Sequence, residues 1–207
     1  MRAKELIEII ESRRSVRKFL PDTVPKSDID KMLYAASWAP SGTNQQNWFF
    51  IVVTSDCVKT AMKEAVVEKL KEVSGKIGLN DAKMVFEAYT SNFVFFDKAP
   101  VVIAVAKRPY VSMATKLFKR YKIELKSWST ADVQGPSAAV QNIILMAHAL
   151  GYGSCWMTGP LIAGEKLEDV LGISAPDELM ALLPIGKPAG PAATPQRKSI
   201  EDVSRYL

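Results

Sequence analysis

The chain has 207 residues, which is enough for one domain with a substantial hydrophobic core. Hydrophobic residues make up 48% of the sequence, charged residues 24% and aromatic residues 9%, a composition that excludes a disordered or fibrous protein. The net charge of +5 favours anionic ligands, and no apolar run approaches the roughly 20 residues of a membrane-spanning helix. Because the first ten residues are charged and do not resemble a secretory signal, we expect a soluble, cytoplasmic protein.

A helical spacing of apolar residues predicts four helices in the first half of the chain. They cover residues 4–13, about 27–39, 55–75 and about 81–92. The second helix is expected to begin with Ser27 as its N-cap and to end at Pro40, because proline cannot continue a helix. Between the second and third helices, the β-branched and aromatic run from Trp48 to Thr54 predicts a buried strand.

The second half of the chain continues this alternation of helices and strands. Its pattern predicts strands at 101–106, 154–158 and 179–185, and helices at about 130–150 and 165–171. Residues 107–126 carry seven basic residues and one acid, and we expect an exposed, lid-like excursion there. The proline-rich residues 186–207 should run extended along a surface. The order of elements lacks a regular βαβ rhythm and predicts one α+β domain, residues 1–207, with a mixed central β-sheet flanked by helices.

Few side chains in this sequence could carry catalysis by themselves. Cys57 and Cys155 lie far apart and form no CxxC pair, which argues against a zinc site or a disulfide framework. With His148 as the only histidine, a histidine metal cluster, a Ser-His-Asp triad and a Cys-His dyad are all disfavoured. We therefore expect no metal and no catalytic side chain, and a bound cofactor would carry the chemistry of an enzyme. The nucleotide-binding patterns GxGxxG and GxxxxGK[ST] do not occur.

A basic segment follows the first predicted helix. Arg13, Arg14, Ser15 and Arg17 supply guanidinium and hydroxyl donors that suit a phosphate monoester. The same residues could also form a solvated basic face that complements the dipole of the helix. Spacing alone does not decide between these interpretations.

Three further segments stand out by their composition. The turn from Ala39 to Trp48 holds four consecutive amides, Asn44–Asn47, which is more than a turn requires and could present polar groups to a flat heterocycle. Glycines bracket the short apolar run of Gly151 to Pro160 and would let another backbone or a flat ring come close. The tail contributes Lys187, Arg197 and Lys198.

In this order and at this spacing, the four segments resemble the FMN-dependent nitroreductase family over nearly the whole chain. The family pattern R-R/H-S-x-R/K-x-F is matched by Arg13–Phe19, and A-P-S-x-x-N-x-Q-P-W by Ala39–Trp48. The pattern G-L/Y-G-x-C-W is matched by Gly151–Trp156, and a terminal I-G-x-P with a downstream Arg follows. The chain departs from the family at Asn47, usually Pro, and at Gly42, often Ser.

The resemblance implies an intertwined homodimer with one FMN at each of two subunit-interface sites. Arg13, Arg14 and Ser15 would hold the phosphate and ribityl chain, and Arg197 would return to the phosphate. Arg17 would lie near the pyrimidine edge of the ring. The remaining contacts implied by the resemblance are Pro40, Ser41, Gly42 and Asn44 from the partner subunit, and Met157, Thr158 and Gly159 near the reactive nitrogen. NADH or NADPH would be the electron donor, and a small flat molecule such as a nitroaromatic or a quinone would be the acceptor.

Other functions compete with this interpretation. Within the family, flavin fragmentation or reductive dehalogenation is an alternative, and a flavin-binding protein without turnover is another. The positive charge and the aromatic residues Tyr110, Tyr121 and Trp128 could indicate nucleic-acid binding, but the basic residues are dispersed and no nucleic-acid motif occurs. We therefore expect neither a nucleic-acid nor a membrane partner. The apolar tail residues Ile200, Val203, Tyr206 and Leu207 are expected to pack on the partner subunit.

Overall fold

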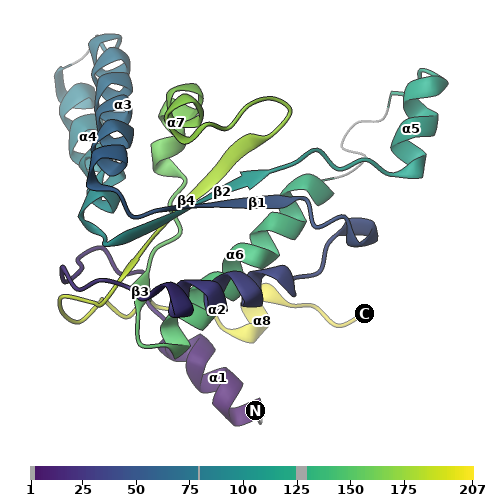
Figure 1. Cartoon of the computed structure of the whole chain (residues 1–207), viewed down its shortest axis with the longest axis horizontal. Coiled ribbons are helices and arrows are strands. Elements are labelled where there is room, and N and C mark those ends of the chain that lie inside the picture. The colour runs from purple at the N-terminus through teal and green to yellow at the C-terminus, as the bar shows by residue number, and fades with distance from the viewer. Residues whose placement is uncertain (1–2, 79, 125–129) are drawn as a thin grey trace.

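The computed structural model of the chain describes residues 3–78, 80–124 and 130–207 (Figure 1). Its centre is a four-stranded sheet in the order β1-β2-β4-β3. The strands are β1 (Trp48–Val53), β2 (Val101–Lys107), β3 (Gly153–Ser154) and β4 (Glu178–Gly186). Each strand pairs antiparallel with its neighbour, and among the described residues the parallel direction occurs only at the isolated bridge between Ser15 and Ser154.

Helices cover both faces of the sheet, because β2 is apolar on both sides. Val101, Ile103 and Val105 face one core cluster, which contains α2 (Lys26–Ser37) and α6 (Ala131–Ala149). Val102 and Ala104 alternate with them and face a second cluster, which contains α3 (Asp56–Gly75) and α7 (Gly164–Leu171). This alternation is the two-residue period of a strand buried on both faces. The predicted α+β class, with a sheet flanked by helices, is confirmed.

Four other helices lie at the edges of this core. They are α1 (Ala3–Ser12), α4 (Asn80–Thr90), α5 (Met113–Arg120) and α8 (Ile200–Val203). Short 3₁₀ turns join the elements: η1 (Gly42–Asn44), η2 (Ser91–Phe93), η3 (Phe95–Lys98) and η4 (Gly159–Ala163). In Figure 1, α4 stands beside α3 at one end of the sheet, whereas α5 projects from the other end.

Three sequence-based expectations need correction. The predicted strand at 154–158 is reduced to Gly153–Ser154, because its pairing with β4 is interrupted after Ser154 and resumes only at the isolated bridge from Met157 to Leu182. The second helix begins at Lys26 after Pro25 and not behind a Ser27 cap, since the Pro25 carbonyl accepts the first backbone bonds. The tail is not wholly irregular, because Ser199 caps α8.

The predicted excursion at 107–126 is exposed but contains regular structure. Ser112 accepts the backbone N–H of Thr115, and this capping interaction starts α5. None of the residues of α5 is buried. Residues 125 and 126 of the predicted excursion, and Trp128, lie outside the described residues.

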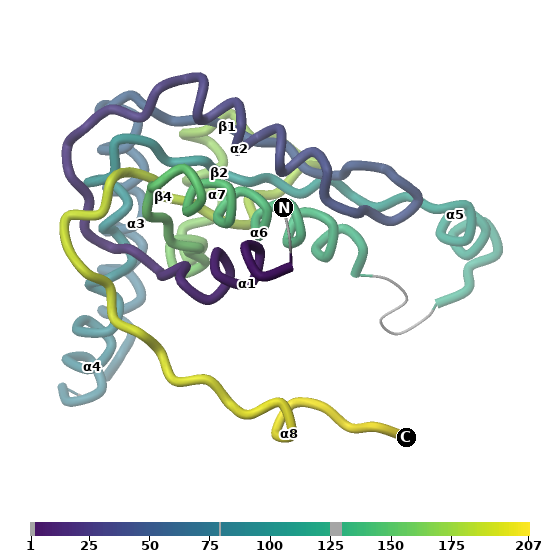
Figure 2. The backbone as a smooth tube through the Cα atoms, turned by 90° about the horizontal axis from the view of Figure 1, so that it is seen from below, coloured from purple at the N-terminus to yellow at the C-terminus, as the bar shows by residue number. Residues whose placement is uncertain are grey.

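The two ends of the chain present apolar side chains to solvent. In α1, Leu6, Ile7 and Ile10 are exposed, and the helix has no buried residue. Figure 2 shows the segment that contains α8 leaving the body of the protein, with Tyr206 and Leu207 fully exposed. The packing of this tail on a partner stays a prediction. In the described ranges, no helix combines the length and apolar character needed to cross a membrane.

Candidate functional site

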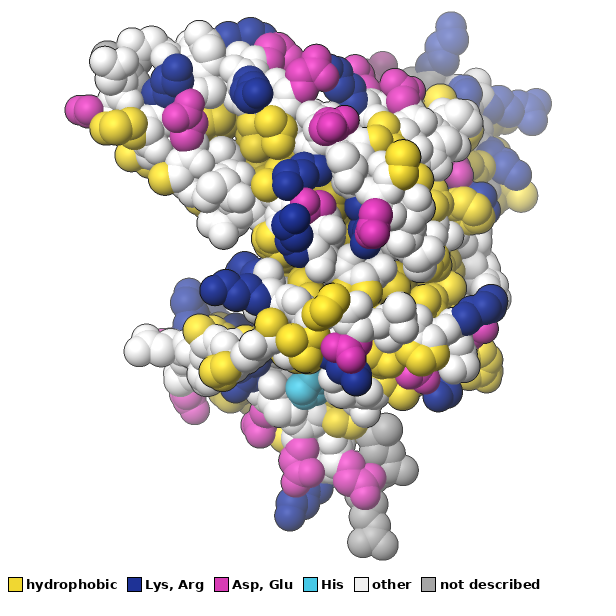
Figure 3. Space-filling view, turned by 60° about the vertical axis from the view of Figure 1, so that its left-hand side comes forward, with side chains coloured by type: hydrophobic (Ala, Val, Ile, Leu, Met, Phe, Trp, Pro, Cys, Tyr) yellow, Lys and Arg dark blue, Asp and Glu magenta, His cyan; other side chains and the backbone are white. Residues whose placement is uncertain are grey.

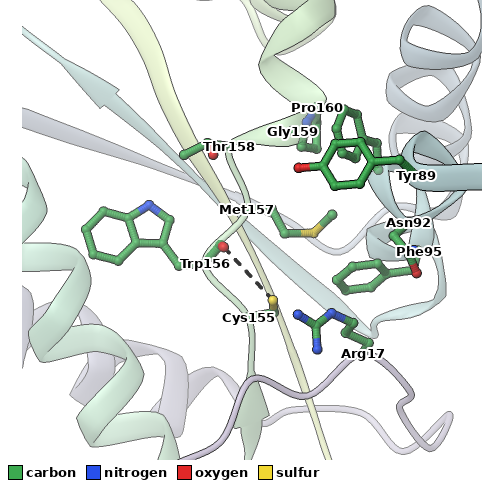
Figure 4. A pocket seen from close by; sticks show the side chains of 11 residues that line it. Arg17, Tyr89, Asn92, Phe95, Cys155, Trp156, Met157, Thr158, Gly159 and Pro160 are labelled. Atoms are coloured by element: carbon green, nitrogen blue, oxygen red, sulfur yellow. Dashed lines mark hydrogen bonds between the residues drawn. The ribbon is translucent and has the colours of Figure 1, made fainter. Parts of the chain in front are cut away.

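A cavity of about 510 Å³ opens between the end of α4 and the segment that follows β3. We call it the apolar cavity, because aromatic and apolar side chains form most of its wall. Its lining residues are Arg17, Tyr89, Asn92, Phe93, Phe95 and Cys155 to Pro160. Figure 4 shows the Arg17 guanidinium near Phe95 and Cys155, whereas the indole of Trp156 points away from them. Figure 3 shows the molecule hollowed on one side, with Lys and Arg side chains beside the hollow.

The basic segment, residues 13–17, is fixed beside β3 by its backbone. The Val16 N–H donates to the Ser154 carbonyl at 2.9 Å, and Val16 itself is buried. Gly153 permits this approach, since a Cβ there would lie only 2.6 Å from a methyl group of Val16. Alternation along an extended chain then turns Ser15 and Arg17 outward, on either side of the buried Val16. The packing of Val16 therefore leaves the predicted site residues Ser15 and Arg17 accessible to solvent.

A second cavity of about 390 Å³, the basic pocket, adjoins the first. It is lined by Arg13, Arg14, Ser15, Arg17, Ala193, Pro195 and Arg197. The structure thus brings together all four predicted arginines and Ser15. Arg14 donates to the carbonyls of Glu11 and Arg13 and, at 3.4 Å, to the hydroxyl of Thr194 in the tail. Arg17 lines both cavities, so the two meet at this side chain.

The guanidinium groups of the basic pocket are available to an anion. Within the described part of the chain, none of the four arginines forms an ion pair with a carboxylate. Planar guanidiniums and a serine hydroxyl form a donor set suited to a phosphate group. The pocket therefore fits the phosphate end of a nucleotide-like ligand.

The predicted ring-facing residues lie on the wall of the apolar cavity. Met157 is buried, and Thr158 and Gly159 follow it at the opening. A Cβ at Gly159 would lie 2.6 Å from the ring of Phe93, so the small residue lets the aromatic wall close against this segment. A flat apolar group entering the cavity would meet backbone on one side and aromatic rings on the other.

Cys155 lines the apolar cavity, whereas His148 lies outside it. Burial raises the pKa of the Cys155 thiol, and the charge of Arg17 only partly opposes that shift. The thiol is therefore protonated at neutral pH. The ring nitrogen Nε2 of His148 lies 2.7 Å from the hydroxyl oxygen of Ser12, outside the apolar cavity. Burial first, and then the charges of Arg13 and Arg14, lower the pKa of His148.

The predicted residues Pro40, Ser41, Gly42 and Asn44 are not brought to either cavity within one chain. They belong to the amide loop, residues 40–47, which precedes β1, whereas the elements that line the apolar cavity, the end of α4 and the segment after β3, lie toward the other end of that strand (Figure 1). A Cβ at Gly42 would meet the ring of Tyr110, and the Ser41 hydroxyl accepts the Gln46 N–H at 2.9 Å. If this loop contacts the same ligand, it must do so from a second subunit.

Sequence reasoning missed one wall of the apolar cavity. Tyr89, Asn92, Phe93 and Phe95 come from the end of α4 and the two turns after it. The available signal was the density of aromatic residues between 86 and 96, which a helical periodicity assigns to the core. Tyr89 is exposed and Phe93 is only half-buried. Among the described residues, no group of three or more His, Cys, Asp or Glu could hold a metal ion.

The sequence also matches a family model, that of the "Nitroreductase family", over residues 10–187. The chain belongs to the nitroreductase family. An iodotyrosine deiodinase of Danio rerio is 30% identical over 98% of this chain and 67% of its own length. A solved BluB-like flavoprotein from Clostridium difficile 630 has a TM-score of 0.87 and 30% identity, with 100% of this chain and 99% of that chain covered.

A second solved structure shows the same fold at lower sequence similarity. It is an oxidised iodotyrosine deiodinase bound to FMN and 3-iodo-L-tyrosine, with a TM-score of 0.74 and 22% identity. The alignment covers 98% of both chains. The fold described above is thus that of known nitroreductase-family flavoproteins, and the predicted family is confirmed.

Proposed function

We propose that the protein is an FMN-dependent oxidoreductase that reduces a small, flat aromatic acceptor. The observation that carries this proposal is that the basic pocket and the apolar cavity are neighbours that share Arg17 in their walls. An anion-binding end joined to a cavity walled by aromatic rings matches a ligand with a phosphate at one end and a flat ring system at the other. Membership of the nitroreductase family supports the choice of FMN.

In this proposal, the two cavities bind different parts of FMN. Arg13, Arg14, Ser15 and Arg197 would hold the phosphate and the ribityl chain, since they line the basic pocket. Arg17 would lie at the pyrimidine edge of the ring, and Met157 to Gly159 along the ring itself. When bound, FMN supplies the electron transfer between donor and acceptor. The protein would bind and orient the reactants, since its Cys155 thiol is buried and its His148 ring contacts Ser12 outside this cavity.

The second subunit completes the proposed site. Pro40, Ser41, Gly42 and Asn44 would reach the flavin from the partner of a cytoplasmic homodimer. The exposed apolar residues of α1 and of the tail support such an assembly, because apolar patches on a surface mark contacts with other chains. The separation of the amide loop from the cavity within one chain supports it as well.

Reductive dehalogenation of a halogenated aromatic compound is the acceptor reaction that the comparisons favour. The iodotyrosine deiodinase of Danio rerio aligns with 98% of this chain. Such a reaction replaces a carbon–halogen bond by a carbon–hydrogen bond and releases halide, at the expense of two electrons and a proton. We propose NADH or NADPH as the electron donor. Reduction of a nitroaromatic or quinone is the second candidate, and the open aromatic wall of the cavity would accept either ring.

An anaerobic reduction experiment tests the proposal. The purified protein, loaded with FMN, is mixed with NADH or NADPH, and the loss of flavin absorbance is followed before each acceptor is added. We expect the absorbance to return with an iodinated phenol, with release of iodide, and with a nitroaromatic compound. A protein that retains no FMN, or whose flavin is reduced but reoxidised by none of these acceptors, would contradict the proposed function.

A further inference from the structure

Two of the four amide side chains of the amide loop, those of Gln45 and Asn47, have a structural role that the proposed flavin contacts do not explain. Gln45 forms two hydrogen bonds with the backbone of one residue, Val111. Its side-chain amide donates to the Val111 carbonyl at 2.5 Å, and its side-chain carbonyl accepts the Val111 N–H at 3.1 Å. This pairing imitates the exchange of bonds between two neighbouring strands.

Asn47 acts at both ends of the same excursion. Its buried side-chain amide donates to the carbonyl of Arg108 at 3.2 Å and to that of Ala131 at 3.4 Å. The Arg108 N–H donates in return to the Asn47 carbonyl at 2.9 Å. Arg108 and Ala131 mark the points where the chain leaves the core and returns to it. One asparagine, at a position where the family usually has proline, therefore joins both ends of the excursion to the amide loop.

The excursion projects from the core beyond these contacts (Figure 1). We call its described residues 109–124 the arm. The arm contains α5, which has no buried residue and projects from the body (Figure 1). Met113, Leu117 and Tyr121 expose apolar surface at helical spacing along it. An exposed apolar helix face on a projecting arm suits contact with another chain.

We propose that Gln45 and Asn47 are positioning residues that hold the arm to the amide loop, so that both reach the partner subunit's site together. The arm then forms part of the wall against which the acceptor binds. This proposal rests on the proposed function, because the partner's cavity is reached only if the amide loop contacts the partner's flavin. The contact between Gly42 and Tyr110 supports it, since it joins the same two segments by packing.

Gln45→Ala and Gln46→Ala form a matched pair for the test. Both side chains are exposed amides in the same turn, but Gln46 bonds only the Asn44 carbonyl, at 3.5 Å. Gln45→Ala should fold, because the side chain is exposed. Trypsin can cleave the arm at Lys116, Lys119, Arg120 and Lys122. Loss of the hydrogen bonds to Val111 should raise the fraction of molecules in which the arm is detached from the amide loop. Because trypsin cleaves the detached arm, we expect cleavage in the arm to be about fivefold faster in Gln45→Ala than in Gln46→Ala.

The kinetic part of the experiment uses the FMN-loaded full chain. In Gln45→Ala we expect the KM for a nitroaromatic or iodophenol acceptor to rise by about fivefold, because binding must now order the arm. FMN retention and the rate of flavin reduction by NAD(P)H should match those of Gln46→Ala. Equal cleavage of the two variants would overturn the positioning role. Faster cleavage with an unchanged acceptor KM would overturn the placement of the arm at the acceptor site. Loss of FMN from wild type would refute the proposed function, while the cleavage ratio would still decide the role of Gln45.

Discussion

The basic segment and the amide loop are both rich in predicted ligand-binding residues, yet the fold treats them differently. The basic segment lies against β3, where the bond from Val16 to Ser154 and the absence of a side chain at Gly153 set its position. Its arginines line the basic pocket, and Arg17 also lines the neighbouring apolar cavity, all within one chain. The amide loop directly precedes β1, and the side chains of Gln45 and Asn47 form hydrogen bonds with the arm and with Arg108 at its start. The difference supports the proposal that one chain supplies the phosphate end of its own site and contributes its amide loop to the site of a partner subunit.

The largest effect is expected at the basic segment. Arg13→Gln removes a charged donor, and a charge-assisted hydrogen bond contributes roughly 1.5–3 kcal/mol. FMN should therefore bind about ten- to hundredfold more weakly, as measured by fluorescence titration. Arg205→Gln is the control, because it removes the same charge outside the basic pocket. Equal FMN affinity of the two variants would show that Arg13 only belongs to a solvated basic face.

Two glycine substitutions compare how firmly each region is packed. Gly153→Ala places a Cβ 2.6 to 2.8 Å from three side-chain atoms of the buried Val16, and such overpacking should lower the free energy of unfolding by about 1–3 kcal/mol. Gly42→Ala meets the half-buried ring of Tyr110, which can swing outward, so its cost should be under about 1 kcal/mol. Urea unfolding measures both. A larger loss for Gly42→Ala would reverse the contrast between the two regions.

Arg17 should act on the reduction potential of the flavin more than on its retention. Reduction places negative charge at the edge that Arg17 is proposed to face, and a fixed cation there favours the reduced form. Because this side chain is exposed, we expect Arg17→Gln to make reduction of the flavin less favourable by about 1 kcal/mol. That corresponds to a reduction potential roughly 20 mV lower for a two-electron couple. A redox titration of Arg17→Gln and of Arg13→Gln compares the reduction potentials of the two variants. An unchanged potential would make Arg17 a phosphate ligand or a surface charge.

The smallest effect concerns the pH dependence of stability near the basic pocket. Burial, followed by the charges of Arg13 and Arg14, lowers the pKa of His148 below its ordinary value of 6.5. The unfolded chain therefore takes up this proton more readily than the folded chain does. Its contribution to stability is present above pH 6.5 and is lost as the pH falls below it. His148→Gln should flatten the unfolding free energy between pH 7 and pH 5, and an unchanged slope in urea titrations would contradict this.

Much of the fold could be predicted because its elements obey simple periodicities. The buried residues of β2 alternate between the two core clusters, and those of α6 recur at helical spacing. Both patterns are visible in the sequence as the spacing of apolar residues. The short β3 could not be predicted, since a continuous apolar run does not show where pairing with β4 is interrupted. For the site, the basic segment was recognisable as a cluster of charges. The aromatic wall from α4 was not, because its contacts join residues that are distant in the sequence.

The amide loop shows a further limit of the sequence. Four consecutive amides indicated a polar surface for a ligand, but the side chains of Gln45 and Asn47 form hydrogen bonds with the backbone of the arm and of its two ends. Residue type predicted the capacity to form hydrogen bonds and could not identify the partner. The distance along the chain between Asn47 and Ala131 hides a contact that only the fold brings about.

Mixed dimers test most directly the claim that each flavin site is shared between two subunits. One chain carries Arg13→Gln and the other carries Asn44→Asp, since Asp tolerates the positive φ of 54° at that position. Each homodimer should lose FMN, because both of its sites are damaged. In a mixed dimer, one site combines both substitutions and the other has neither. The account predicts that purified mixed dimers regain about one FMN per dimer with wild-type affinity, whereas a site built within one chain would leave them as deficient as the two homodimers.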